Sequence, residues 1–242
     1  MIKTSIDEIE LNKFNKTAQE WWDPIGEFKM LHQINPIRVD YIKSKIFSHF
    51  NIADISSLKH LNLLDVGCGG GLITVPMHNM GFNVSALDAN EHNIIAAKSY
   101  ANTNNFKINF INNTVENHVD TGNKYNVIIC LEVIEHVACL PLFLHSLYNM
   151  LNEGGILIIS TINRTVKSYL LAIIMAEYIL RWVPKKTHDY EKFVKPSEIF
   201  NIFKTSNISL KELKGLSFDL INNSWFISDD IDVNYFATFI KN

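Results

Sequence analysis

Five short apolar runs between residues 61 and 161 constrain the fold of this chain more than any other feature. None of them is longer than eight residues, and most are rich in β-branched side chains. Nearly continuous apolar runs of this length are typical of strands buried on both faces of a parallel sheet. Because helical lengths of sequence separate the runs, the pattern predicts βαβ units and a doubly wound α/β sheet. The runs are LNLLDV (61–66), FNVSALD (82–88), INFIN (108–112), YNVIICLE (125–132) and GILIIST (155–161).

The remaining segments are predicted to be helical before this region and mixed after it. With 47% of its 242 residues hydrophobic, the chain can bury one large core, which excludes general disorder. We therefore predict a single domain over residues 1–242, with a helical N-terminal extension (1–55) and an apolar, basic insert (163–188) after the fifth strand. The further predicted elements are helices at 7–22, 36–50, 165–183 and 196–205, and strands at 208–215, 224–228 and 234–240.

Charge and cysteine content exclude several classes of protein. The 22 basic and 25 acidic side chains give a net charge of −3, which argues against a generally basic nucleic-acid binder, so we expect no nucleic-acid partner. Three cysteines are too few for a disulfide scaffold and suggest a reducing compartment. The first ten residues contain three acids and resemble no signal or transit peptide, and no apolar run is long enough to span a bilayer. We expect a soluble, cytoplasmic protein.

The glycine-rich segment LLDVGCGGG (63–71) ends the first predicted strand and precedes a helix. Glycines such as Gly67 and Gly69 let the backbone turn sharply and approach a ligand without a Cβ in the way. The helix N-terminus behind them favours anionic groups. Asp88 follows Gly67 by 21 residues, at the end of the next strand, where a carboxylate can accept hydrogen bonds from ribose hydroxyls. These features predict a nucleoside-containing cofactor.

Spacing within the glycine loop favours one such cofactor. The dinucleotide fingerprint requires a third glycine where this chain has Leu72, so a pyrophosphate is not expected close to the helix. Asp65 lies two residues before the first glycine and is placed to reach a cationic ammonium group. An acid before the turn and a second acid after the next strand suit S-adenosylmethionine, which has an amino-acid end and a ribose. The alternative is a glycine turn that only packs strand against helix.

Together with the segment CLEVIEHV (130–137), these motifs resemble class I S-adenosylmethionine-dependent methyltransferases. Longer segments are similar to the ubiquinone-biosynthesis O-methyltransferase family, and the likeness runs from about residue 14 to residue 236. These segments are WWDPIGEFKMLHQINPIRVDYI (21–42), TINRTVKSYLLAIIMAEYILRWVPKKTHDYEKFVKPSE (161–198) and DVNYF (232–236). The resemblance implies a Rossmann-like methyltransferase fold with a seven-stranded mixed sheet. It implies methylation of ring hydroxyls on polyprenylated phenol, catechol and demethylubiquinol intermediates, and association with other proteins of the same pathway.

The resemblance also implies cofactor contacts at Arg38, Gly67, Asp88 and Leu131. Gly67 and Asp88 agree with the spacing argument, which adds Gly69. Arg38 lies in the N-terminal segment. The glycine loop by itself gives no reason to expect a cofactor contact there. The chain departs from the family around 137–140, where a turn containing Pro or Asp is common, and this leaves the local loop shape open.

Glu132, Glu135 and His136 follow the fourth predicted strand with a spacing of i, i+3 and i+4. If a helical turn begins there, the three side chains share one face. As metal ligands, they would hold a divalent ion that lowers the pKa of a phenol. Without a metal, His136 is the candidate general base, oriented by a glutamate. The resemblance favours Mg²⁺ or another divalent ion, and a solvated helix cap is the third alternative.

Residues 164–188 contain five basic side chains and one acid, Glu177, in a chain of net negative charge. The helix predicted there is apolar almost all round, but it is too short and too charged to span a bilayer. It suits the interface of an anionic membrane, so we expect peripheral association with the inner membrane. A core helix is the alternative. The basic residues are Arg164, Lys167, Arg181, Lys185 and Lys186.

Two other functions compete with methyl transfer. A nucleotide-dependent oxidoreductase is disfavoured by Leu72 at the third-glycine position. A non-catalytic lipid-binding or scaffolding protein with the same fold is disfavoured by the intact set of Asp65, Gly67, Gly69 and Asp88. The sequence therefore predicts an S-adenosylmethionine-dependent O-methyltransferase.

Overall fold

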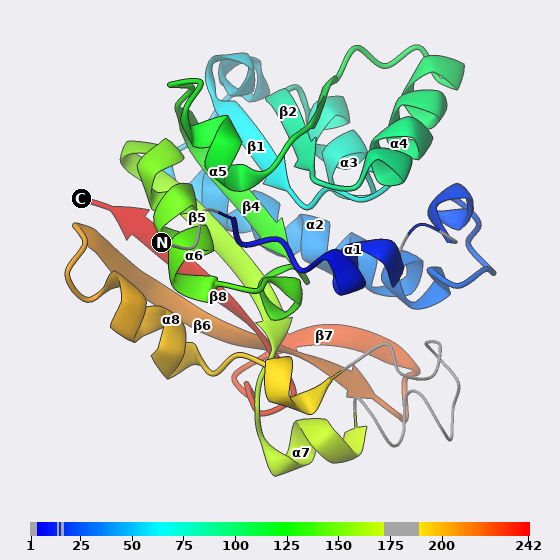
Figure 1. The fold of residues 1–242 in the computed structure, drawn as a ribbon, viewed down its shortest axis with the longest axis vertical. Coiled ribbons are helices and arrows are strands. Elements are labelled where there is room, and N and C mark those ends of the chain that lie inside the picture. Colours follow the sequence, from blue (N-terminus) through cyan, green and yellow to red (C-terminus); the bar gives the residue numbers. More distant parts are fainter. Residues whose placement is uncertain (1–3, 14, 16, 172–188) are drawn as a thin grey trace.

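A computed structural model describes residues 4–13, 15, 17–171 and 189–242 (Figure 1). In this part of the chain the strands form one sheet in the order β3-β2-β1-β4-β5-β8-β6-β7. The first five strands are parallel, and β8, β6 and β7 continue the sheet in antiparallel pairs. The strands are β1 (Asn62–Val66), β2 (Asn83–Asp88), β3 (Asn109–Asn112), β4 (Tyr125–Leu131), β5 (Leu151–Ile162), β6 (Ile208–Asp219), β7 (Ser224–Ser228) and β8 (Asn234–Lys241).

All five strands predicted from the apolar runs are present, in a parallel arrangement. The count of seven strands is wrong by one, because the described residues contain eight. The count of seven came from the family resemblance, whereas the eight separate strands predicted from the sequence include β7, which pairs with the second half of β6 as a hairpin at the edge of the sheet. The mixed, doubly wound class is otherwise as predicted.

Helices cover both faces of the sheet (Figure 1). On one face, buried residues of α2 and α3 pack on β1, β4 and β5, with Ile42, Ile46 and Met77 fully buried. On the other face, α5, α6 and α8 pack on the same strands. The helices are α1 (Glu8–Lys13), α2 (Lys29–His49), α3 (Thr74–Met80), α4 (Glu91–Thr103), α5 (Val115–Val119), α6 (Leu140–Met150), α7 (Val166–Ser168) and α8 (Pro196–Phe203), with 3-10 turns η2 (Ala18–Glu20), η3 (Ile55–His60), η4 (Ile134–His136) and η6 (Tyr190–Lys192).

The N-terminal extension differs in detail from its prediction. Helix α1 ends at Lys13, and η2 follows it, so the predicted helix over 7–22 is broken. Helix α2 begins seven residues before Pro36, which lies inside it and does not start it. Proline is favoured in the first helical turn, and this preference placed the expected boundary too late.

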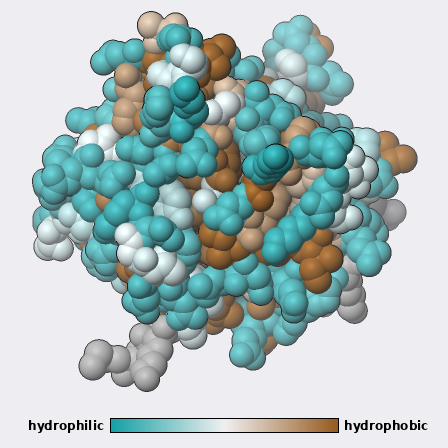
Figure 2. Space-filling model, turned by 90° about the horizontal axis from the view of Figure 1, so that it is seen from above, coloured by the Kyte–Doolittle hydropathy of each residue, from teal (hydrophilic) through white to brown (hydrophobic). Residues whose placement is uncertain are grey.

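The face viewed from above has hydrophobic side chains gathered toward a hollow, with hydrophilic ones around them (Figure 2).

The apolar insert is described only at its beginning. Thr165 caps α7 by accepting a hydrogen bond from the Ser168 amide. Four apolar side chains of this stretch are exposed, namely Val166, Tyr169, Leu170 and Leu171. The greater part of the helix predicted at 165–183 falls on residues 172–188, outside the described residues. Among the described helices, none is long and apolar enough to cross a membrane.

Candidate active site

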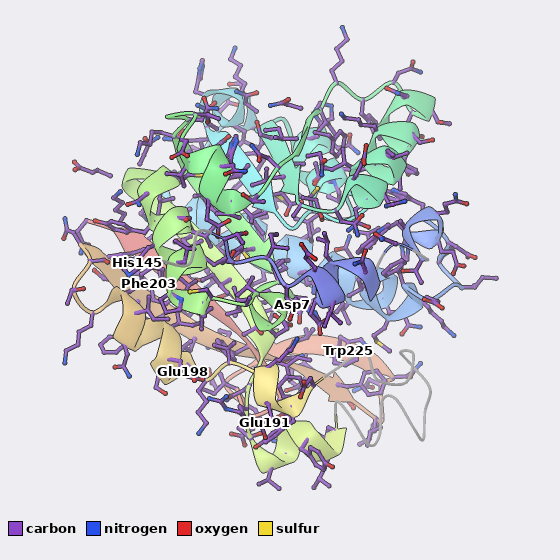
Figure 3. The ribbon with its side chains drawn as sticks, viewed as in Figure 1. Asp7, His145, Glu191, Glu198, Phe203 and Trp225 are labelled. Atoms are coloured by element: carbon purple, nitrogen blue, oxygen red, sulfur yellow. The ribbon has the colours of Figure 1, made fainter. Side chains whose placement is uncertain are left out.

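A cavity of about 1020 Å³ opens at the carboxyl ends of β1, β2 and β4. This edge is where ligands bind in open parallel sheets. Distant segments contribute to its wall: Figure 3 labels Asp7, just before α1, and Trp225, on β7, and both line the cavity. The predicted site residues that line it are Arg38, Gly67, Gly69, Asp88, Leu131, Glu132, Glu135 and His136.

The glycine loop after β1 has the tight turn that its sequence predicts. The amides of Gly67 and Cys68 donate to the Leu87 carbonyl at 2.8 and 3.1 Å, which fixes the loop to the end of β2. Gly67 has a φ of 68°, and a Cβ added there would lie 2.3 Å from Cγ2 of Val133. Both its conformation and its surroundings therefore require glycine.

Asp88 is buried at the end of β2, with its carboxylate held by neighbouring donors. Its Oδ2 accepts from the Gly69 amide at 2.8 Å, and its Oδ1 accepts from the Asn90 amide at 2.8 Å. Burial raises the pKa of Asp88, whereas these hydrogen bonds lower it. Nδ2 of Asn93 also donates to Oδ2, at 3.3 Å. Because each carboxylate oxygen accepts about two hydrogen bonds, Oδ1 retains acceptor capacity for a ribose hydroxyl.

Asp65, on β1 two residues before Gly67, is a second buried acid in the cavity wall. Its Oδ2 accepts from the Thr74 hydroxyl at the start of α3. Burial raises the pKa of Asp65 to about 7, and the charge of Asp88 contributes in the same direction. A cationic group in the cavity would stabilise the ionised form of Asp65. This position fits the predicted contact with the ammonium group of S-adenosylmethionine.

Arg38 projects from α2 into the cavity wall, 6% exposed. Its Nη2 donates to Oε1 of Glu132 at 2.8 Å, whereas its buried Nε has no hydrogen-bond partner among the described residues. An unpaired buried donor is costly unless a ligand or water satisfies it. Leu131, at the end of β4, supplies an apolar part of the same wall.

The acid–acid–histidine cluster does not form the single helical face expected from its spacing. Glu132 has a φ of 53°, and the 3-10 turn η4 begins only at Ile134. Oε1 of Glu132 accepts from Arg38 and, at 2.7 Å, from the Ser160 hydroxyl. The left-handed backbone at Glu132 separates this residue from the turn, and the prediction of one shared face is wrong.

Glu135 and His136 have separate partners. Oε2 of Glu135 accepts from the Thr161 hydroxyl at 2.8 Å, and Nδ1 of His136 lies 3.0 Å from Oε2 of Glu10. Burial and the charge of Glu132 raise the pKa of Glu135 to about 7. Among the residues that the structure describes, no group of three or more His, Cys, Asp or Glu is arranged to hold a metal ion. In this arrangement the three side chains do not fit a divalent ion.

The N-terminal segment contributes contacts that sequence reasoning missed. Lys192 bonds to both Asp7 and Glu10 at 2.8 Å, and the Ala138 amide donates to the Ser5 carbonyl at 2.7 Å. Residues before α2 therefore join η4 and η6 along one side of the cavity. From the sequence, Asp7 and Glu10 were expected only to lie in a helix, with no role in the site.

Comparison with known proteins identifies the family. A model of the methyltransferase domain matches residues 41–212. The ubiquinone biosynthesis O-methyltransferase of Rickettsia akari is 53% identical over 96% of this chain and 91% of its own length. That of Pelagibacter ubique is 47% identical over 98% and 99%. The chain belongs to the ubiquinone biosynthesis O-methyltransferase family.

Solved structures support the fold of this methyltransferase. Magnesium protoporphyrin IX methyltransferase from Synechocystis, with bound S-adenosylhomocysteine, matches with a TM-score of 0.67 at 18% identity, over 97% of this chain and 99% of the other. The plantazolicin methyltransferase BpumL, also with bound S-adenosylhomocysteine, gives 0.58 at 18% identity over 97% and 98%. The predicted family, fold class and S-adenosylmethionine-dependent O-methyltransferase activity are confirmed, which rejects the oxidoreductase and the non-catalytic alternatives.

The position of Asp88 gives a prediction for cofactor binding. Asp88→Ala removes the acceptors for buried ribose hydroxyls, so we expect S-adenosylhomocysteine binding to weaken by about 1–3 kcal/mol. Isothermal titration calorimetry measures the change, and circular dichroism verifies the fold. The matched control is Asp120→Ala, an exposed residue outside the cavity, which should bind as the wild type does. Unchanged affinity in Asp88→Ala would remove Asp88 from the site.

The buried carboxyl of Glu135 gives a prediction for stability against pH. Its pKa of about 7 in the folded chain exceeds the usual value near 4.5, so the stability present below about pH 4.5 is lost as the pH rises through 7. Between pH 5 and 8, the free energy of unfolding of Glu135→Gln should therefore fall by about 1–3 kcal/mol less than that of the wild type. Asp65 retains part of the dependence in both proteins.

Urea unfolding at a series of pH values measures this difference. Glu153→Gln makes the same chemical change at an exposed position on β5 and should follow the wild-type curve. If the free energies of unfolding of Glu135→Gln and of the wild type change in parallel with pH, the pKa of Glu135 is not raised by folding and the prediction is wrong.

Proposed function

We propose that this enzyme transfers a methyl group to ring hydroxyls of polyprenylated phenols or catechols and of demethylubiquinol intermediates. The observation that carries the proposal is one cavity with two unlike regions. Buried acids and the glycine loop line the cofactor region, while Leu216, Phe218 and Trp225, on β6 and β7, are among the apolar residues that line the remainder. A polar ring attached to an apolar tail is complementary to such a cavity.

The chain's own residues bind and orient the two reactants. We propose that Asp88 accepts the ribose hydroxyls, that Asp65 faces the ammonium group, and that Gly67, Gly69, Arg38 and Leu131 complete the cofactor wall. S-adenosylmethionine supplies an activated methyl group on its sulfonium. Because that group is already activated, the remaining tasks are to align the acceptor oxygen and to remove its proton.

His136 is the proposed general base. A phenol with a pKa of about 10 is a weak nucleophile at neutral pH, so loss of its proton accelerates transfer. Glu10 is paired with Lys192, which favours its ionised form, and an ionised Glu10 requires Nδ1 of His136 to be the donor. The basic lone pair of the neutral imidazole then lies on Nε2. The orienting glutamate comes from α1 rather than from the neighbouring acids.

Binding of a divalent ion would require the same residues to change partners. To bind a metal together, Glu132 would have to give up its hydrogen bonds to Arg38 and Ser160, and Glu135 its hydrogen bond to Thr161. The contacts of the described residues therefore support the general-base hypothesis, and chelation distinguishes the two. A shared prediction of both is that His136 acts on the acceptor rather than on cofactor binding.

Replacement of His136 by alanine should lower kcat by about 10²–10⁴-fold while S-adenosylhomocysteine affinity changes little. The assay measures methyl transfer to a polyprenyl catechol and to a demethylated quinol, with and without a chelator. Chelation-resistant wild-type activity supports the general base. Loss of activity on chelation, restored by magnesium, would establish the metal in its place. Full activity of His136→Ala would contradict both.

We also propose that the insert contacts the surface of an anionic membrane. Its exposed apolar residues near α7 support an interfacial position. Arg164 and Lys167 are already paired, with Glu198 and Asp230 respectively, so they contribute less to membrane binding. The remaining basic residues, Arg181, Lys185 and Lys186, lie outside the described residues.

Changing Arg181, Lys185 and Lys186 together to glutamate should nearly abolish binding to vesicles that contain anionic lipid, since each basic residue contributes about 1 kcal/mol. Cosedimentation measures binding, and added salt should weaken that of the wild type. The matched control changes three exposed lysines, Lys59, Lys98 and Lys107, to glutamate and should retain most of its binding. Equal sedimentation of the two triple variants would contradict the proposal.

A further inference from the structure

Trp21 packs directly against the glycine loop. The side chain is only 9% exposed, and its indole stacks on Phe28 with ring centroids 3.8 Å apart. A Cβ added to Gly69 would lie 2.4 Å from Cζ2 of Trp21, and one added to Gly70 would lie 2.3 Å from its Cβ. These two glycines therefore provide the space that Trp21 occupies. This explains Gly70, for which the cofactor argument gives no reason.

The same indole begins a chain of hydrogen bonds that ends at Asp88. Nε1 of Trp21 donates to Oδ1 of Asn93 at 2.9 Å, and Nδ2 of Asn93 donates to Oδ2 of Asp88 at 3.3 Å. That oxygen also accepts from the Gly69 amide, beside which the indole packs. Trp21, Asn93, Asp88 and Gly69 thus form a closed circuit of buried groups.

This circuit fixes the orientation of the Asn93 amide. The indole nitrogen is a donor only, so it requires the oxygen of Asn93, and the amino group must then point to Asp88. The carboxylate of Asp88 only accepts, so it requires the same amide orientation as the indole does. Without the indole donor, Asn93 keeps its bond to Asp88 but loses the second contact that holds its side chain in place. An amide held at both ends positions the carboxylate better than an amide held at one end.

We propose that Trp21 is a positioning residue that holds Asp88, through Asn93, in the orientation that binds the ribose of the cofactor. The inference rests on the ribose role proposed for Asp88. Trp21 itself needs no contact with the ribose, because its effect passes through the Asn93 amide. It gives the N-terminal segment a part in cofactor binding that is distinct from covering the cavity.

The test compares two ligands, S-adenosylhomocysteine and its analogue without the 2′- and 3′-hydroxyls. Trp21→Phe retains an aromatic ring but removes the indole donor. We expect this variant to bind S-adenosylhomocysteine about 3- to 10-fold more weakly, and the analogue with nearly wild-type affinity. Asn93→Ala should show the same selectivity. In turnover, Trp21→Phe should raise KM for S-adenosylmethionine and leave kcat unchanged.

Trp22→Phe is the matched control. This neighbouring indole donates to the Gly70 carbonyl at 2.9 Å and stacks on Tyr100, and no hydrogen bond joins it to Asn93 or Asp88. Any loss of affinity in this variant should be equal for both ligands. Calorimetry gives the affinities, and thermal unfolding verifies that each variant is folded.

Each outcome of this comparison decides the proposal. Equal losses for both ligands in Trp21→Phe would reduce Trp21 to a packing residue and overturn the inference. If Asp88→Ala also fails to distinguish the ligands, the ribose role of Asp88 is wrong and the inference falls with it. If the wild type binds neither ligand, the proposed cofactor site itself is wrong.

Discussion

The cost of burying carboxyl groups at one edge of the sheet governs much of this structure. Asp65, Asp88 and Glu135 are all less than 9% exposed, and burial raises the pKa of each. Ionised groups persist in such surroundings only with hydrogen-bond donors or opposite charges nearby. Each acid accordingly receives a hydrogen bond from an adjoining element, namely Thr74 at the start of α3, the glycine loop, or Thr161 on β5. The proposed contacts with an ammonium group and with ribose hydroxyls involve two of these acids, Asp65 and Asp88.

Other contacts along the cavity join segments far apart in the chain. Trp21 reaches Asp88 through Asn93, Arg38 reaches Glu132, and Lys192 reaches Glu10. The strands alone fix only the ends from which the acids project. The N-terminal segment and η6 supply the contacts that set side-chain orientation along the cavity. The side chains that line the cavity are therefore held by the N-terminal segment as well as by the sheet.

The sequence predicted those features whose cause is local. Strand runs, the glycine turn and Asp88 all follow from short-range patterns, and the structure contains each of them. Glu132 was misplaced because its spacing assumed a helix, whereas its backbone is left-handed. Glu10 and Trp21 were missed because a contact between segments more than 70 residues apart leaves no periodicity to recognise. The membrane role of residues 164–188 remains a prediction.

Polarity along the cavity connects these local features to the proposed acceptor. Leu220 lines the cavity and is also 86% exposed, so the cavity wall continues to the surface at the β6–β7 hairpin. Leu171 lines the cavity from the insert and is 42% exposed. An acceptor with a polar ring and a long apolar tail gains by leaving the tail along such a rim, because the ring alone then enters the acid-lined region. In that arrangement the buried acids face the polar ring, and the apolar rim contacts only the tail.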